Sequence, residues 1–162
     1  MQDPSGAAFP WKPPTLWEAL GKDFLSQQDD VSIDDIKGPG KVIGLYFSAH
    51  WCPPCKAFTP LLVKTYNKVR ADGKQLEIIF CSSDRTTASF GEYFGEMPWL
   101  AIPHGDTRNE ALSSMFDVNG IPTLVLIDGA TGEVINASGR SAVSADPEGA
   151  NFPWHPPPVW ST

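Results

Sequence analysis

The sequence has little cysteine, no long apolar run and no excess of positive charge. Only 3 of its 162 residues are cysteine, too few for a scaffold held by several disulfides, so a close pair is typical of a catalytic or metal-binding site. No apolar stretch reaches the roughly 18 residues that span a bilayer. The start, MQDPSGAAFPW, lacks the basic patch and apolar run of a signal peptide. We therefore expect no membrane contact and a location in the cytosol or nucleus.

The charge balance disfavours nucleic acid as a partner. Lysine and arginine number 12 against 19 aspartates and glutamates, a formal net charge of -7. An acidic surface repels phosphate backbones, so we expect no nucleic-acid partner. The length is that of one ordinary domain, and the 41% of residues that are hydrophobic are enough for a core.

Many of the 16 prolines crowd at the two ends of the chain, in similar segments. FPWKPPTLW begins at Phe9 and FPWHPPPVW begins at Phe152. Proline-rich segments form semi-rigid spacers, and internal repetition is typical of arrays. We interpret residues 1–14 and 151–162 as linkers around a domain over residues 15–150, which would be one unit of a tandem array. The alternative is two unrelated proline-rich tails.

Between these ends, β-rich apolar segments alternate with helical patterns. This order predicts an α/β fold with a central mixed sheet, helices on both faces and a closing β-hairpin around GATG. A short strand and a helical turn are expected within residues 30–38. The main strands are expected at 41–48, 75–83, 122–128 and 133–138. Helices are expected at 56–73, with a bend at Pro60, at 86–97 and at 107–116.

Cys52 and Cys55 lie in AHWCPPCKAF, where the first long strand ends and the first long helix begins. Pro53 suits the first helical position, and the free N–H groups of a helix start stabilise a thiolate. We therefore expect Cys52 to attack a disulfide of another molecule and Cys55 to resolve the mixed disulfide. Pro53 and Pro54 stiffen the loop but supply no N–H donors, so the pKa of Cys52 should be lowered only moderately.

Half of a zinc site is the competing interpretation of this pair. Zinc usually takes four ligands, and the other candidates lack ligand spacing, so we expect no metal. These candidates are Cys81, His50, His104 and His155. Cys81 lies in an apolar strand and is expected to be a buried, unreactive thiol; a second redox position is the alternative. His50 is expected to be a solvated loop residue rather than a partner of the thiolate.

Pro122 is a second sequence feature that indicates a redox function. It stands in NGIPTLVLID, directly before a strand, where the bond that precedes it can be cis. Because proline has no N–H, the neighbouring backbone stays free to receive an extended substrate strand. An ordinary trans proline at the start of a strand is the alternative.

Together these motifs resemble the thioredoxin fold: a strand, WCxxC, a helix that contains proline, and a later GIPT. YFSAHWCPPCKAFTPLL, YFGEMPWLAIP, GIPTLVLID and DPEGANFPW are similar to the nucleoredoxin and tryparedoxin branch, over about Leu16 to Trp154. The resemblance implies reduction of protein disulfides, with electrons from NADPH through a reductase or a small thiol. It also implies a cis Ile121–Pro122 bond beside the thiols. No bound cofactor is implied beyond the redox-active Cys52–Cys55 disulfide.

Two positions depart from relatives. Tyr46 stands six residues before Cys52, where ordinary thioredoxins keep a buried carboxylate that accepts the proton of the second cysteine. A neutral phenol cannot do so near pH 7, so water or a neighbour such as Asp84 is expected to take that proton. Next to Asp84, Arg85 would repel the cationic polyamine thiol of tryparedoxins, and the SSDR segment resembles nucleoredoxins, which are tandem arrays of thioredoxin-like domains.

Two functions stay open from the sequence. The first is a protein-disulfide reductase, and the second is a redox-sensing module that holds or releases a signalling partner according to the Cys52–Cys55 state. In either case Trp51 is expected to be a flat, partly exposed contact for partners. A peroxidase would need a separate peroxidatic cysteine motif, which we do not find. Because both cysteines are present in the expected fold context, we favour the reductase.

Overall fold

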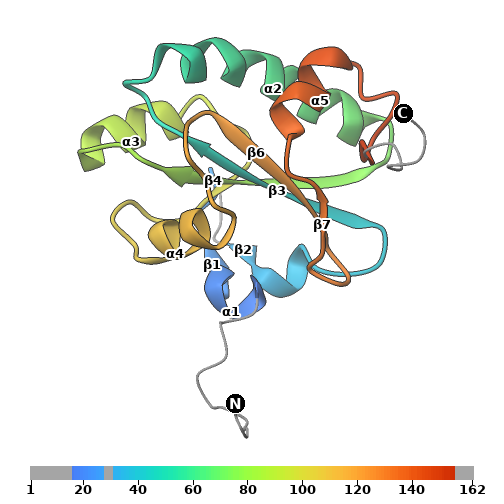
Figure 1. Ribbon diagram of the computed structural model, residues 1–162, viewed down its shortest axis with the longest axis horizontal. Helices are drawn as coiled ribbons and strands as arrows, with labels where there is room; N and C mark the ends of the chain where they lie inside the picture. The colour runs from blue at the N-terminus through green and yellow to red at the C-terminus, as the bar shows by residue number, and fades with distance from the viewer. Residues whose placement is uncertain (1–15, 28–30, 156–162) are drawn as a thin grey trace, which may run out of the picture.

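A five-stranded mixed sheet forms the centre of the computed structural model, which describes residues 16–27 and 31–155 (Figure 1). Its order is β5 (Leu100–Ala101), β4 (Gln75–Ser82), β3 (Lys41–Ser48), β6 (Thr123–Asp128) and β7 (Val134–Asn136). The first three strands are parallel, whereas β6 is antiparallel to β3 and β7 is antiparallel to β6. The predicted mixed sheet and its closing hairpin are confirmed.

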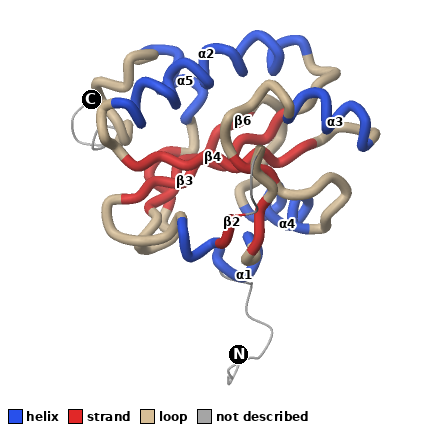
Figure 2. Tube along the Cα trace, turned by 180° about the vertical axis from the view of Figure 1, so that it is seen from behind, coloured by secondary structure: helices blue, strands red, loops and turns tan. Residues whose placement is uncertain are grey.

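Helices cover both faces of this sheet, as predicted (Figures 1 and 2). One face carries α2 (Pro53–Ala71), α3 (Thr87–Phe94) and α5 (Gly139–Ala145). The other carries α1 (Leu16–Leu20), the short helix η1 (Ile33–Asp35) and α4 (Arg108–Met115). A small antiparallel pair, β1 (Asp23–Phe24) and β2 (Val31–Ser32), lies beside this second group.

Strand β3 shows why the sheet has two apolar faces. Its side chains alternate, so Val42 and Tyr46 join the core under α2 and α3, while Ile43, Leu45 and Phe47 join the core over α1 and α4. All five are buried. A continuous apolar run is therefore what a central strand between two helical layers requires.

The helices that the sequence predicts begin and end close to the expected residues, as α2 shows. This helix starts at Pro53, the first helical position expected from the sequence, and passes through Pro60 without interruption. Proline suits the first helical turn because its missing N–H would be unpaired there. The predicted helix start is therefore confirmed, and Cys55 lies in the first turn of α2.

The predicted C-terminal boundary at residue 150 is too early. Trp154 is 5% exposed and belongs to the core under α2 and α5. Its indole N–H donates to Asp146 Oδ2 at 3.0 Å, and its carbonyl accepts from Asn136 Nδ2 at 2.8 Å. The second FPW segment thus packs on the domain, because its aromatic rings cover apolar surface. The first FPW copy, the rest of residues 1–14, and residues 156–162 lie outside the described residues.

Candidate active site

The Cys52–Cys55 pair occupies the start of α2, where β3 leads into the helix. Cys52 is the residue that caps the helix, with extended backbone angles (φ −99°, ψ 110°), and its sulfur accepts the Cys55 N–H at 3.3 Å. The two cysteines are joined in a disulfide, with their Cα atoms 5.2 Å apart. When this bond is reduced, the same N–H and the partial positive charge of the helix start favour a thiolate at Cys52.

The two cysteines differ in access to solvent. Cys55 is fully buried, whereas Cys52 is 5% exposed. Ile121 packs against this pair, and its carbonyl oxygen lies 3.8 Å from Cys52 Sγ. The Ile121–Pro122 bond is cis, as the resemblance implied. An incoming sulfur can therefore reach Cys52 more readily than Cys55, next to the backbone of residue 121.

Trp51 forms an aromatic platform beside Cys52. It is 48% exposed, which confirms the expected partial exposure. Its indole N–H donates to Ser83 O at 3.1 Å, and the Arg85 guanidinium lies 4.8 Å from its ring centroid. A hydrogen bond and a cation–π contact thus hold the ring in place, so that one large apolar face is ready for a partner.

Asp84 fixes the loop that carries these residues. Its side chain accepts the His50 N–H at 2.7 Å and the Ser82 hydroxyl proton at 2.8 Å. Its carbonyl accepts from His104 Nε2–H at 2.9 Å. Both carboxylate oxygens are therefore engaged in positioning the chain just before Trp51. No local pattern predicts the contact with His104, because Asp84 and His104 belong to different loops.

Tyr46 lies directly under the dithiol and is fully buried. Its hydroxyl is 2.6 Å from Thr59 Oγ1 and 3.5 Å from the Cys55 carbonyl oxygen. Burial raises the pKa of the phenol well above its ordinary value, so the group stays neutral. A neutral phenol in this place is a hydrogen-bond donor and cannot serve as the base that deprotonates Cys55.

Replacing Tyr46 tests this assignment. Tyr46→Phe is expected to change turnover less than about twofold and to lower the free energy of unfolding by about 1 kcal/mol, the usual value of one hydrogen bond. Tyr46→Asp is expected to speed release of the mixed disulfide where the new carboxylate ionises. Single-turnover reduction of a model disulfide across pH, with denaturant unfolding of each variant, measures both effects. A large loss of rate in folded Tyr46→Phe would show that the phenol takes part in proton transfer.

The third cysteine is buried in the sheet, as predicted. Cys81 is 2% exposed, and its thiol donates to Ile79 O at 3.8 Å. Burial raises the pKa of this thiol well above its ordinary value. It therefore lacks the thiolate character that reactive cysteines need.

Thiol labelling of the reduced, folded protein is expected to separate the cysteines. Cys52 should react at least about tenfold faster than Cys81 with iodoacetamide near neutral pH, because the thiolate fraction falls tenfold for each pKa unit. Peptide mapping after timed quenching identifies the labelled residue, and denatured protein serves as the control in which all thiols react. Comparable labelling of Cys81 without denaturant would contradict its burial.

A groove of about 660 Å³ opens beside the dithiol. It lies between the Trp51 loop, the loop after β4, helix α4 and the segment that leads to Ile121. Three carboxylate side chains line it and no lysine or arginine does, among the residues that the structure describes. The lining includes Trp51, Ser83, Asp84, Glu110, Asp117 and Ile121. The cysteines themselves do not line the groove, but Trp51 and Ile121 do, and Ile121 packs against the sulfur pair.

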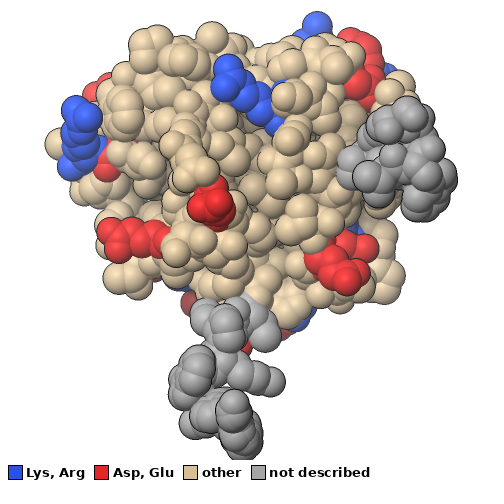
Figure 3. Space-filling model, in the orientation of Figure 1, with Lys and Arg blue, Asp and Glu red and all other residues tan. Residues whose placement is uncertain are grey.

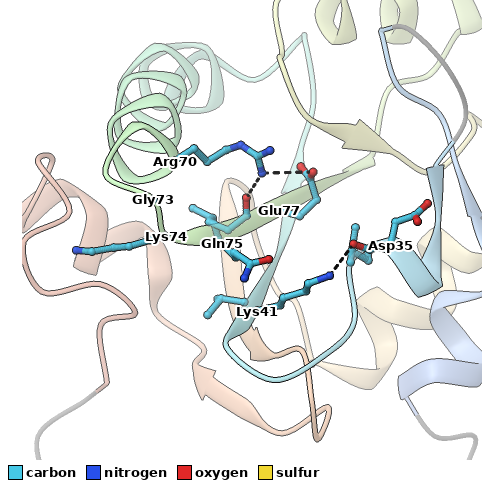
Figure 4. Close-up of a pocket in the computed structure, with 10 residues that line it drawn as sticks. Asp35, Lys41, Arg70, Gly73, Lys74, Gln75 and Glu77 are labelled. Carbon is cyan, nitrogen blue, oxygen red and sulfur yellow. Dashed lines mark hydrogen bonds and ion pairs between the residues drawn. The ribbon is translucent and has the colours of Figure 1, made fainter.

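A second hollow of about 250 Å³ lies where β3 and β4 begin, at the end of the strands opposite to Cys52 (Figure 4). Its three basic side chains point in different directions and each binds a backbone carbonyl. Lys41 donates to Asp35 O, Arg70 to Leu76 O and Lys74 to Gly149 O. Since these charges do not converge, we assign no ligand to this hollow.

Other kinds of site find no support in the described ranges. Within residues 16–27 and 31–155, no three His, Cys, Asp or Glu side chains gather as metal ligands. No helix in the same part of the chain is long and apolar enough to cross a membrane. On the face shown in Figure 3, small charged groups of both signs are scattered over largely uncharged surface, and some lie beside a group of the opposite sign.

Known proteins match this fold. The family model described as thioredoxin-like matches residues 40–134. Tryparedoxin from Trypanosoma brucei superposes with a TM-score of 0.78 at 40% identity, over 83% of this chain and 92% of that one. This chain belongs to the thioredoxin-like family. The nucleoredoxin of Danio rerio is 44% identical over 97% of this chain, which places the chain in the nucleoredoxin and tryparedoxin branch.

The chain spans 37% of the length of that nucleoredoxin. A structure of tryparedoxin II complexed with glutathionylspermidine is also similar, with a TM-score of 0.77 at 37% identity over 84% of this chain and 94% of that one. Membership of the thioredoxin-like family identifies the Cys52–Cys55 disulfide as a redox-active pair.

Proposed function

We propose that this domain reduces protein disulfides through Cys52 and Cys55. The Cys52 thiolate attacks one sulfur of the target disulfide, the target S–S bond breaks, and one target thiolate leaves. The Cys55 thiol then attacks Cys52 Sγ, loses its proton to solvent or to the departing sulfur, and releases the second target thiol. The electron pair has passed to the target, and the domain is left with its own disulfide. The 3.3 Å approach of Cys55 N–H to Cys52 Sγ is the observation that carries the proposal.

The oxidised domain then needs an external reductant. We propose either an NADPH-dependent reductase or a small thiol. The second source is supported by the neighbour complexed with glutathionylspermidine. In this chain Arg85 places a positive charge against Trp51, so a polyamine arm would be repelled from the ring and would have to lie along the acidic groove instead. A reducing compartment, the cytosol or nucleus, is the corresponding proposal, because the cycle begins from reduced cysteines.

Target proteins are proposed to dock on Trp51 and along the groove beside it. Trp51→Ala is expected to raise KM for a protein disulfide by about tenfold, the loss of one well-packed aromatic contact, with much less change for a small aromatic disulfide. Val134→Ala is the matched control, because Val134 is comparably exposed but lies on β7, away from Cys52. Equal losses with both substrates in Trp51→Ala would mean that the ring supports the dithiol rather than the partner.

Neighbouring thioredoxin-like domains are proposed as partners within a longer chain. The repeated FPW segments support this, as does the fraction of the nucleoredoxin length that this chain spans. In such an array each FPW segment would pack on the domain that precedes it, as Trp154 does here. A coding sequence with no adjacent similar domain would contradict this arrangement.

Insulin reduction with dithiothreitol as the electron source tests the reductase directly. Acceleration over the thiol alone is expected, since the reduced pair is regenerated in each cycle. The alternative, a redox-sensing module, predicts no acceleration and a partner whose binding differs between the reduced and oxidised domain. The exposed Trp51 beside a redox-active pair is the observation that favours this second function.

A further inference from the structure

A chain of buried hydroxyl groups lies beneath the dithiol and is not used in the steps above. Thr59 is at its centre: its oxygen is 2.9 Å from the Cys55 carbonyl oxygen, 2.6 Å from the Tyr46 hydroxyl and 2.6 Å from the Tyr93 hydroxyl. The Tyr93 hydroxyl is in turn 2.8 Å from Ser48 Oγ. All four hydroxyl-bearing residues are at most 2% exposed.

Proton counting fixes the direction of every bond in this chain. A carbonyl only accepts, so the single hydroxyl proton of Thr59 goes to Cys55 O. Both tyrosines must then donate to Thr59 Oγ1, which has a lone pair for each. Since the Tyr93 proton is spent there, Ser48 donates to Tyr93. The hydroxyl dipoles therefore point, in sequence, from Ser48 toward the backbone of Cys55.

We propose that Thr59 is a positioning residue for the redox pair, which gathers the hydrogen bonds of Tyr46 and Tyr93 and fixes the Cys55 peptide in the first turn of α2. That turn carries the Cys55 N–H that binds Cys52 Sγ. A neutral hydroxyl is too weak a base to hold the proton of a thiol, so the chain takes no proton from Cys55. It directs the positive ends of its dipoles toward the dithiol, where a carboxylate would place a negative charge. The arrangement thus favours the thiolate form of Cys52.

Charged and titratable groups around the dithiol come from each neighbouring element and stay unchanged in the Thr59 variants below. They are His50 in the active-site loop, Asp84 and Arg85 in the loop after β4, Lys56 on α2, Glu110 and Asp117 in the groove, and Tyr46 and Tyr93 below. If replacing Thr59 shifts the titration of Cys52, the cause is therefore the loss of the hydroxyl chain. The cause is not a lost charge.

The rate of Cys52 alkylation against pH in reduced protein tests the proposal. Thr59→Val keeps the shape of the side chain but removes the central hydroxyl. It is expected to raise the pH midpoint of Cys52 alkylation by about half a unit, which lowers the rate about threefold at pH values below the midpoint. Thr59→Ser, which keeps the hydroxyl, is expected to restore the midpoint. Tyr93→Phe is expected to shift it less, in the same direction, because Thr59 still donates to Cys55.

Thr65→Val is the matched control for stability. Thr65 is fully buried on the same helix and donates to Pro147 O at 2.7 Å, farther along α2. It is expected to lower stability while it leaves the alkylation midpoint unchanged. A wild-type midpoint in folded Thr59→Val would overturn the proposal, as would an equal shift in Thr65→Val. If Thr59→Val does not fold, an unshifted midpoint in Tyr93→Phe would overturn it. The role of Thr59 in catalysis rests on the proposed reductase activity. Alkylation needs no disulfide substrate, so its outcome can fail or succeed independently of that activity.

Discussion

Replacing Cys52 with serine is expected to abolish disulfide reduction. The attacking thiolate is lost, and a hydroxyl at the same place is protonated at any pH at which the protein folds. Loss of a nucleophile of this kind lowers turnover on the order of 10⁴-fold or more. Insulin reduction under saturating dithiothreitol, corrected for the reaction of the thiol alone, measures the residual rate.

Cys81→Ser is the control for that experiment, because the thiol at position 81 is buried and carries a raised pKa. It is expected to keep turnover close to that of the native domain. Folding of each variant is checked by its unfolding transition. Measurable turnover in Cys52→Ser, or a matching loss in Cys81→Ser, would show that the attacking sulfur has been assigned to the wrong residue.

Cys55→Ser is expected to stop the reaction one step later. Cys52 can still attack, but no second thiol lies near enough to expel the target, so a mixed disulfide accumulates. Intact mass spectrometry after mixing with a protein disulfide is expected to show one target chain per domain, removed by dithiothreitol. Turnover is expected to fall to near background, as in Cys52→Ser.

The two variants are distinguished by what they retain. Cys52→Ser is expected to form no adduct under the same conditions, because Cys55 is fully buried. An adduct on Cys55 in Cys52→Ser, or none on Cys52 in Cys55→Ser, would reverse the assigned roles. The same Cys55→Ser protein, applied to a cell extract, identifies the physiological targets by the proteins it retains.

The central strands and the helix that carries the dithiol could be predicted because their signals are local. Strand β3 is a continuous apolar run, as a strand buried on both faces must be. Pro53 directly after Cys52 indicated where α2 begins. The placement of Ile121 beside the dithiol followed from the resemblance rather than from any pattern in the residues alone.

The supporting contacts of the site could not be predicted, because they join residues far apart in the chain. Thr59 and Tyr93 are separated by 34 positions, and Thr59 in a helix carries no sign of its partner. His104 and Asp84 meet only because the loops after β4 and β5 end at the same edge of the sheet. Helix α5, GRSAVSA, has too few large apolar residues for a clear helical period.

Trp154 illustrates a different limit. A proline-rich composition is typical of a linker, yet the aromatic rings within it bury apolar surface wherever a groove accepts them. Trp154 fills such a place against α5 and β7 through Asp146 and Asn136. Composition therefore located the end of the domain only to within a few residues.

A single turnover without added thiol tests the reductase mechanism most directly. The domain is reduced, freed of reductant and mixed with a protein disulfide, and both products are mapped by mass spectrometry after acid quenching. We expect one target disulfide reduced per domain, with Cys52 and Cys55 joined to each other and Cys81 still a free thiol. An unchanged target, or a product disulfide that includes Cys81, would contradict the mechanism.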